Sequence, residues 1–125
     1  MSDSSKTGNI GWQDLTVADA KSVRDFYAQV VGWKFTAQSM GDYEDFNMIA
    51  PSDGETVAGI CHARGANADV PPAWLIYIIV DDVDASAAKC VELGGKIITG
   101  PRSTGGGRFA VIQDPAGAVC AIFKS

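Results

Sequence analysis

A few residues in this chain have the type and spacing that chemistry at a protein site requires. Asp14 follows Trp12 by two positions, so on a strand both side chains lie on one face. If that face lines a pocket, the Asp14 carboxylate can act as a general base or hold a cationic group of a ligand. The alternative is a structural role, in which Asp14 pairs with an arginine or caps a loop.

Two further polar residues can likewise have either a functional or a structural role. Tyr77 can donate a hydrogen bond to a carbonyl or phenolate, or it can fill the core with its hydroxyl group satisfied. Arg108 follows the glycine run 105–107 and can clamp a carboxylate or phenolate, or form a salt bridge with a sheet neighbour. We predict Asp14 and Tyr77 as catalytic residues and Arg108 as a ligand-binding residue.

The single histidine, His62, directly follows Cys61. Adjacent strand residues face opposite ways, so these two are not expected to form a nucleophilic cysteine–histidine pair. His62 can perform acid–base chemistry at a ligand site or lie in a surface loop. Large apolar residues, with Phe109 among them, can form a wall for a flat ligand or belong to the core. Besides His62 and Arg108, the residues predicted to bind ligand are Trp12, Phe46, Met48 and Trp74.

The elements that must position these residues occur twice along the chain. An ungapped offset of 63 residues pairs Val17 with Val80, Asp19 with Asp82, Gly32 with Gly95, and Phe46 with Phe109. Each half predicts a strand, a helix capped by aspartate and ended by glycine, and three more strands. We therefore predict an α+β fold, in one domain over residues 1–125, of two tandem βαβββ modules. They span about 8–62 and 74–125 and are joined by a linker, 63–73.

Hydrophobic periodicity and turn residues set the predicted element boundaries. The predicted strands cover 10–17, 33–38, 43–50, 56–62, 74–80, 96–99, 108–113 and 118–123, and the second helix runs to about Leu93. One module of about 55 residues buries too little surface to be secure alone. We therefore expect the modules to share a curved mixed sheet around a cleft, with the helices outside.

Composition excludes several classes of protein. The 125 residues are 46% hydrophobic and 20% charged, which is typical of a globular chain, and the net charge of −5 argues against nucleic acid as a partner. No apolar run approaches the length of a membrane span, and the amino terminus has no apolar signal region. The three cysteines are widely spaced and form no CxxC motif. We expect a cytoplasmic protein that binds neither nucleic acid nor membrane.

Two stretches carry a family resemblance. The segment 12–19, followed by Phe-Tyr at 26–27 and Val-Gly-Trp at 31–33, resembles the opening module of the vicinal oxygen chelate superfamily. The segment 80–84, with Leu-Gly-Gly at 93–95 and Asp-Pro-Ala-Gly at 114–117, resembles its second module. The resemblance covers about Gly8 to Phe123 and implies the glyoxalase/bleomycin resistance/dihydroxybiphenyl dioxygenase-like fold. One such scaffold hosts many chemistries, so the fold alone does not name a reaction.

The resemblance also implies where a metal ion would be held. Metal-dependent members use four side chains, one from the first and one from the last strand of each module. Those positions are Trp12, Ala58, Leu75 and Ala121 in this chain, and all four are apolar. This departure predicts no metal and no cofactor. It also argues against glyoxalase I activity, metal-dependent dioxygenase activity and fosfomycin-type thiol transfer.

We predict a family member that binds a small, partly aromatic or carbonyl-bearing molecule in its cleft without the family's metal. One alternative is a metal-independent lyase or isomerase with Asp14 as base and Tyr77 or Arg108 stabilising an enolate. A second alternative is a metal-dependent lyase or dioxygenase with relocated ligands, such as Asp14, Glu44, Asp45 or His62. By analogy with the family, we also expect a homodimer.

Overall fold

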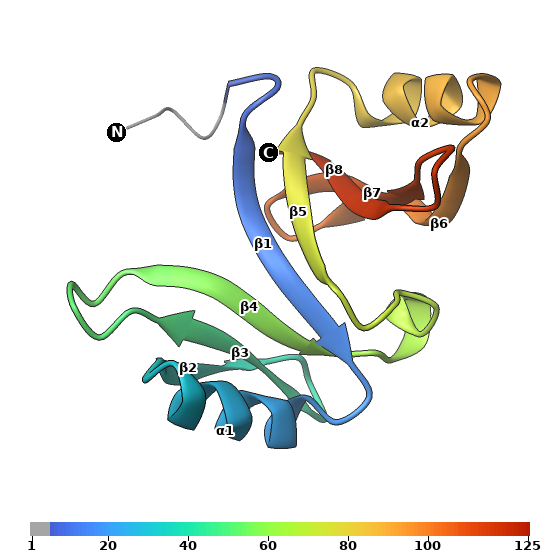
Figure 1. Cartoon of the computed structure of the whole chain (residues 1–125). Helices are drawn as coiled ribbons and strands as arrows, with labels where there is room; N and C mark the ends of the chain where they lie inside the picture. Colours follow the sequence, from blue (N-terminus) through green and yellow to red (C-terminus); the bar gives the residue numbers. More distant parts are fainter. Residues whose placement is uncertain (1–5) are drawn as a thin grey trace. The chain divides into compact units, whose positions relative to one another are not determined.

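The computed structural model describes residues 6–125 and contains the βαβββ order twice (Figure 1). The first half comprises β1 (Ile10–Val17), α1 (Ala20–Val30), β2 (Lys34–Ser39), β3 (Glu44–Ile49) and β4 (Thr56–His62). The second half comprises β5 (Trp74–Ile79), α2 (Val83–Glu92), β6 (Lys96–Thr104), β7 (Gly107–Gln113) and β8 (Val119–Lys124). A 3₁₀ turn, η1 (Gly65–Asn67), lies in the connecting segment. The predicted α+β fold of two βαβββ modules is confirmed.

The chain divides into two compact units that do not coincide with the two halves. The first unit is Gln13–Trp74, and the second unit contains the residues up to Trp12 together with Leu75–Ser125. In the second unit the Gly8 amide donates to the Ile79 carbonyl at 2.7 Å, and the Ile79 amide donates to the Asn9 carbonyl at 2.9 Å. Strand β1 therefore begins in the second unit and continues in the first.

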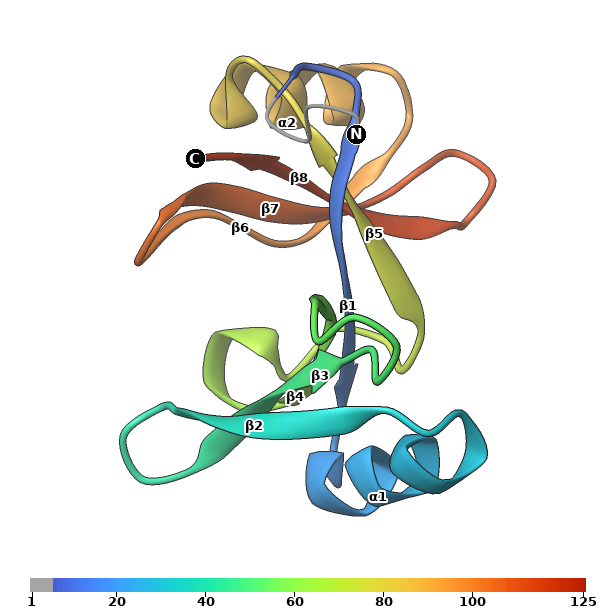
Figure 2. The ribbon, with the colours of Figure 1, turned by 90° about the vertical axis from the view of Figure 1, so that its left-hand side faces the viewer.

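Both units build their sheets in the same strand order. The order is β2-β3-β4-β1 in the first half and β6-β7-β8-β5 in the second. Strands β1 and β4 are parallel, as are β5 and β8, whereas the hairpin neighbours are antiparallel. A parallel first and last strand requires a crossover, which the helix and the intervening hairpin provide. In Figure 2, α1 lies along β2, β3 and β4, and α2 lies along β6, β7 and β8.

The first unit packs large side chains between its sheet and α1. The Asp19 carboxylate caps this helix by accepting the Ser22 amide at 3.1 Å. Met48 and Ile60 are 0% exposed. The buried residues of this core are Leu15, Ala20, Phe46, Met48, Ala58 and Ile60.

The second unit repeats this arrangement with smaller side chains. Asp82 caps α2 by accepting the Ala85 amide at 3.0 Å. The buried residues between α2 and the sheet are Val83, Ala87, Ala110 and Ile122. Neither helix in the described part of the chain is long and apolar enough to cross a membrane.

The register of the strands corrects the ungapped offset of 63 residues. Asn47 pairs with Gly59 in the first unit, and Val111 pairs with Ala121 in the second. The offset is therefore 64 from β3 to β7 (Asn47 to Val111) and 62 from β4 to β8 (Gly59 to Ala121). Register shifts within β6 and a shorter turn between β7 and β8 account for the change. Phe46 therefore corresponds to Ala110 and not to Phe109.

Candidate functional site

In the first unit, polar side chains lie on the sheet face that points away from α1. Because Leu15, Phe46 and Ile60 pack under the helix, the alternating residues of the same strands face the other way. The Asn47 side-chain amide lies 3.5 Å from both the Thr36 hydroxyl and the Gln38 carbonyl oxygen. We call this surface the polar face, and its residues are Asp14, Thr36, Gln38, Asp45, Asn47 and Cys61.

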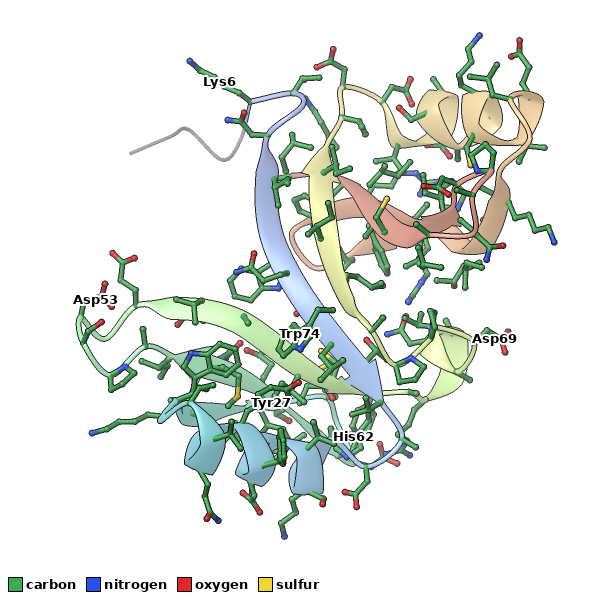
Figure 3. The ribbon with its side chains drawn as sticks, viewed as in Figure 1. Lys6, Tyr27, Asp53, His62, Asp69 and Trp74 are labelled. Atoms are coloured by element: carbon green, nitrogen blue, oxygen red, sulfur yellow. The ribbon has the colours of Figure 1, made fainter. Side chains whose placement is uncertain are left out.

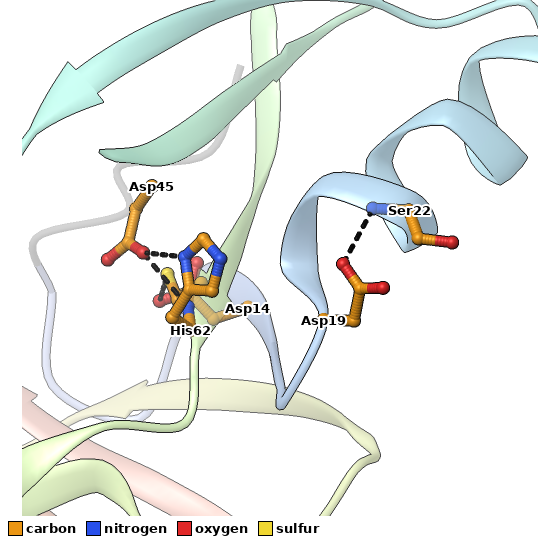
Figure 4. Close-up of polar contacts among 6 residues, drawn as sticks. Asp14, Asp19, Ser22, Asp45 and His62 are labelled. Carbon is orange, nitrogen blue, oxygen red and sulfur yellow. Dashed lines mark hydrogen bonds and ion pairs between the residues drawn. The ribbon is translucent and has the colours of Figure 1, made fainter. Parts of the chain in front are cut away.

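Asp45, a residue of the polar face, contacts His62, the single histidine of the sequence. Its carboxylate is largely buried, with 8% of the residue exposed. One oxygen, Oδ1, accepts the His62 backbone amide at 2.9 Å and lies 3.3 Å from the His62 Nδ1 atom (Figure 4). The imidazole packs edge-on against the Tyr43 ring, with a centroid distance of 5.6 Å. The carboxylate therefore fixes the orientation of the histidine ring.

Cys61 lies between two carboxylates of the polar face. Its Sγ atom is 4.0 Å from the Asp14 Oδ2 atom. Burial raises the pKa of the Cys61 thiol far above its ordinary value, and the negative charges of Asp14 and Asp45, with a hydrogen bond to Asp45, raise it further. The thiol therefore stays protonated at neutral pH and acts as a weak hydrogen-bond donor, not as a nucleophile.

The residues at the family's metal-ligand positions do not fit a metal ion. The strand register changes one of the four positions. Ala121 pairs with Tyr77, and the equivalent pair in the first unit is Gly59 with Asp14, so the position equivalent to Ala121 is Gly59 and not Ala58. Trp12, Gly59, Leu75 and Ala121 offer no side-chain donor that binds a divalent cation. Within residues 6–125, no group of three or more His, Cys, Asp or Glu side chains is arranged to hold one. The alternative ligands considered above, Asp14, Glu44, Asp45 and His62, therefore do not form such a group either.

In the second unit, an aromatic pair and an arginine lie together. The Tyr77 and Phe109 rings stack, with their centroids 6.5 Å apart and an interplanar angle of 26°. The Arg102 guanidinium carbon lies 4.5 Å from the centroid of the Phe109 ring. Ala110 and Ile122 face α2, so Phe109 points to the other side of the sheet. We call Tyr77, Phe109 and Arg102 the aromatic–arginine stack.

Several residues predicted to bind ligand lie in other surroundings. Phe46 and Met48 are buried in the core beneath α1. The Trp74 indole N–H donates to the Tyr27 hydroxyl at 3.0 Å, and its ring packs against those of Tyr27 and Trp33 (Figure 3). Trp12 is half-buried in the stretch of β1 that belongs to the second unit. These apolar side chains do not join the polar face.

Arg108 pairs with a helix residue, although its predicted alternative to ligand binding was a salt bridge within the sheet. Its Nε atom lies 2.6 Å from the Asp84 carboxylate, and its NH2 group lies 2.8 Å from the other oxygen of that carboxylate. This hydrogen bond and the positive charge hold the pKa of Asp84 below its ordinary value. Asp84 lies in the first turn of α2, so Arg108 lies on the helix side of the sheet.

The sequence reasoning missed the contacts that Asp45 makes and did not consider Arg102. The bridging role of Asp45 follows from the antiparallel pairing of β3 with β4, which places it beside Cys61. A hairpin register drawn from the turn at 51–54 is the signal that could have revealed it. Arg102 lay outside the predicted strand 96–99, because the register shifts in β6 are not visible in a hydrophobic pattern.

Comparison with known proteins identifies a family. A family model for the Glyoxalase/Bleomycin resistance protein/Dioxygenase superfamily matches residues 9–122. The putative glyoxylase CFP32 of Mycobacterium bovis is 33% identical over 122 residues, which are 96% of this chain and 47% of that protein. The anthracycline biosynthesis protein DnrV of Streptomyces peucetius is 33% identical over 133 residues, covering 94% of this chain and 47% of that protein. The chain thus spans about half the length of these relatives.

Solved structures share the fold at lower sequence identity. A Streptomyces coelicolor methylmalonyl-CoA epimerase variant, in complex with 2-nitronate-propionyl-CoA, superposes with a TM-score of 0.59 at 18% identity. The match covers 96% of this chain and 99% of the epimerase chain. A hypothetical protein from Bacillus halodurans superposes with a TM-score of 0.61 at 15% identity, with 96% of each chain covered.

Proposed function

This chain belongs to the Glyoxalase/Bleomycin resistance protein/Dioxygenase superfamily, and from that premise we propose that it binds a small, carbonyl-bearing and partly aromatic molecule without a metal ion. The proposal rests on which side chains offer hydrogen-bonding or metal-binding atoms. The polar face offers hydrogen-bonding groups around a protonated thiol, whereas the family's metal positions hold Trp12, Gly59, Leu75 and Ala121. The polar groups can orient an organic ligand, whereas the side chains at those four positions do not coordinate a cation.

The ligand class follows from the side chains available to contact it. The Tyr77 hydroxyl can donate to a carbonyl oxygen, and the stacked rings of Tyr77 and Phe109 suit a flat apolar group. The relative named for anthracycline biosynthesis, and the epimerase solved with an acyl-CoA analogue, support a carbonyl-bearing ligand. No cofactor enters this proposal.

A second candidate function is metal-independent proton transfer. The specific observation is that Asp14 lies 4.0 Å from a thiol that holds its proton, so the carboxylate is the member of this pair that can accept a proton. In this function Asp14 removes a proton next to the ligand's carbonyl group. The proton returns to the same carbon, so the carbon acid is racemised or isomerised with no net change in composition.

Calorimetric titration tests the binding function. The probes are 2-acetylnaphthalene and 2-ethylnaphthalene, which differ in the carbonyl group. We expect saturable binding of 2-acetylnaphthalene that persists in EDTA and is weakened about fivefold or more by Tyr77→Phe, because a hydrogen bond to the carbonyl is lost. Tyr43→Phe is the matched control, since Tyr43 packs against His62 and Arg64 and lies outside the stack. Binding that appears only with added Zn²⁺, Ni²⁺ or Mn²⁺ would overturn the proposal.

Proton exchange separates the two functions. If Asp14 is a base, the methyl protons of bound 2-acetylnaphthalene exchange with D₂O faster than in buffer, as followed by proton NMR. Asp14→Asn should abolish that acceleration while leaving the affinity within about twofold. Asp53→Asn is the control, because Asp53 lies in the exposed turn between β3 and β4. Binding without accelerated exchange supports the binding function and excludes the enzymatic one for this probe.

A further inference from the structure

We propose that the outer edge of β2 pairs with the same edge of a second copy of this chain, in antiparallel orientation, to form a two-fold dimer. Strands β2 and β6 stand at the two ends of the eight-stranded order, and no strand within residues 6–125 pairs with the outer side of either one. Each edge therefore carries backbone groups with which a further strand could pair. The proposed ligand plays no part in this pairing.

Strand β2 lacks the features that protect an edge strand. It pairs with β3 residue by residue from Lys34 to Ser39, without a register shift. All of its residues are exposed, and it contains no proline, glycine or acidic residue. Proteins usually protect exposed edges with charges, prolines or bulges. In β2 the one charged residue is Lys34, at the first position, so the rest of the edge is open to another strand.

Strand β6 is protected by an irregular backbone. Its pairing with β7 shifts register between Ile97 and Thr99 and again between Thr99 and Arg102. Gly100 lies in the second shift with a φ of +87°, and Pro101 has no N–H group to donate to another strand. Pairing of β2 with β6 of the next copy, which would build an open filament, is therefore disfavoured. Pairing of β2 with itself closes a dimer.

Hydrogen bonding in the β2–β3 hairpin determines which backbone groups face outward. The Met40 amide donates to the Tyr43 carbonyl at 2.8 Å, so every second residue before Met40 also directs its backbone groups at β3. The N–H and C=O groups of Phe35, Ala37 and Ser39 therefore point away from β3. The two-fold pairing that uses all three places Ala37 opposite Ala37 of the second copy, and Phe35 opposite Ser39 of the second copy. The side chains that meet at the axis are thus small.

Side chains at this edge complement each other in that register. Lys34 lies opposite Met40 of the second copy, and Met40, which is 46% exposed, can cover the lysine stem. Asp42 follows in the hairpin, where it lies 3.5 Å from the Arg64 guanidinium and keeps 81% of its side chain exposed. A lysine of each copy thus meets a carboxylate of the other. The chain has a net charge of −5, but none of its acidic residues lies in β2, so repulsion between copies is not concentrated at this edge.

Sedimentation velocity over a range of concentrations tests the dimer. We expect the mass of the native species to rise from 13.1 kDa to twice that value as the concentration increases. Ala37→Pro removes an N–H group that faces outward and should weaken the dimer by about tenfold or more, because the hydrogen bonds at the axis are lost. Ala37→Val is the matched control, since valine keeps the N–H group and suits a strand, and it should dimerise like the native chain.

Charge reversal tests the register. Lys34→Glu places a carboxylate beside Asp42 of the second copy and should weaken the dimer by about fivefold. The double variant Lys34→Glu/Asp42→Lys restores opposite charges across the axis and should recover most of the affinity. Lys96→Glu is the matched control, because it changes the net charge equally at the start of β6, and it should leave the dimer unchanged.

Four results would overturn the proposal. A native chain that stays monomeric would leave the β2 edge to an unlike partner. Assemblies larger than a dimer would indicate that β2 pairs with β6 of the next copy. A dimer that Ala37→Pro does not weaken, or one that Lys34→Glu and Lys96→Glu weaken equally, would form through another surface. If thermal melting shows that Ala37→Pro does not fold, the charge-reversal variants decide.

Discussion

The two halves of the eight-stranded sheet have the same strand order, and each packs against one helix, but they present different chemistry on the face turned away from that helix. In the first unit that face carries Asp14, Asp45 and Cys61. In the second unit the corresponding positions, taken from the strand pairing, are Tyr77, Phe109 and Phe123. The buried residues between helix and sheet are apolar in both units because they form the core. The fold therefore constrains one face of each sheet and leaves the other face free to acquire a function.

The cores themselves differ in the size of their side chains. Phe46 in the first unit corresponds to Ala110 in the second, and both are buried against their helix. The Phe46 ring also lies beneath the Arg24 guanidinium, whose carbon is 4.6 Å from the ring centroid. The first core thus depends on one aromatic side chain that the second core lacks.

The largest effect on stability is expected from removing the Phe46 ring, which the second core lacks. Phe46→Ala should lower the free energy of unfolding by about 4 kcal/mol, because a buried ring is lost and a cavity remains. Urea unfolding followed by circular dichroism measures the change. Phe35→Ala is the control, since Phe35 also contacts Arg24 but is 39% exposed, and it should cost much less. A loss below about 1 kcal/mol for Phe46→Ala would show that the two cores tolerate the same side chains.

A smaller effect concerns the contribution of the cysteine thiols to the free energy of unfolding, which depends on pH. Because the pKa of folded Cys61 is raised above that of the unfolded chain, near 8.5, the unfolded chain loses this proton first. The resulting stabilisation is complete below about pH 8.5 and falls as the pH rises, by about 1 kcal/mol per pH unit. Urea unfolding between pH 8 and 10.5 should therefore give a flatter dependence for Cys61→Ala than for the native chain.

The second unit provides the comparison for this measurement. Burial, followed by the negative charge of Asp114, raises the pKa of Cys120. Cys61 faces two carboxylates, whereas the carboxylate acting on Cys120 is Asp114 alone. Cys120→Ala should therefore flatten the pH dependence less than Cys61→Ala. If the two variants flatten the pH dependence of stability equally, the two carboxylates near Cys61 do not raise its pKa more than Asp114 raises that of Cys120.

Much of the fold could be predicted from local patterns. The bounds of β1 and β4 agree with the predicted strands, and Asp19 and Asp82 both cap their helices as predicted. These features depend on alternation and on a capping side chain, which are local properties of the sequence. The extension of β6 to Thr104 was not predicted, because a glycine and a proline at 100–101 interrupt the hydrophobic pattern.

The candidate site was harder to predict because it depends on strand register. A one-residue change in offset turns every side chain of a strand to the other face. The ungapped offset therefore paired Phe46 with Phe109, although Phe46 faces a helix and Phe109 faces away from one. The same slip hid the pairing of Arg102 with Phe109. Predictions for β1 and β5, such as those for Asp14 and Tyr77, were unaffected, because the offset of 63 residues holds there.

The smallest effects are expected where the two halves are most alike. Asp19→Ala and Asp82→Ala should each lower the free energy of unfolding by about 1 kcal/mol, because each removes one hydrogen bond to a free helix amide. Thermal melting measures both losses. Asp19→Asn and Asp82→Asn are the matched controls, since asparagine also caps helices. A twofold difference between the two alanine variants would show that one helix contributes more to stability than the other.

Strand β1 gives the two units a mutual dependence that a simple tandem repeat lacks. Gly8 and Asn9, directly before this strand, are hydrogen-bonded to Ile79, while its later residues pair with β4. A fragment that starts at Leu75 would therefore be missing an edge that its own sheet uses. Cutting the backbone within 63–73 would leave two polypeptides, one of which still supplies that edge to the other. The protein is thus suited to reassembly from two separately expressed pieces, provided that the amino-terminal piece keeps the residues before Gln13.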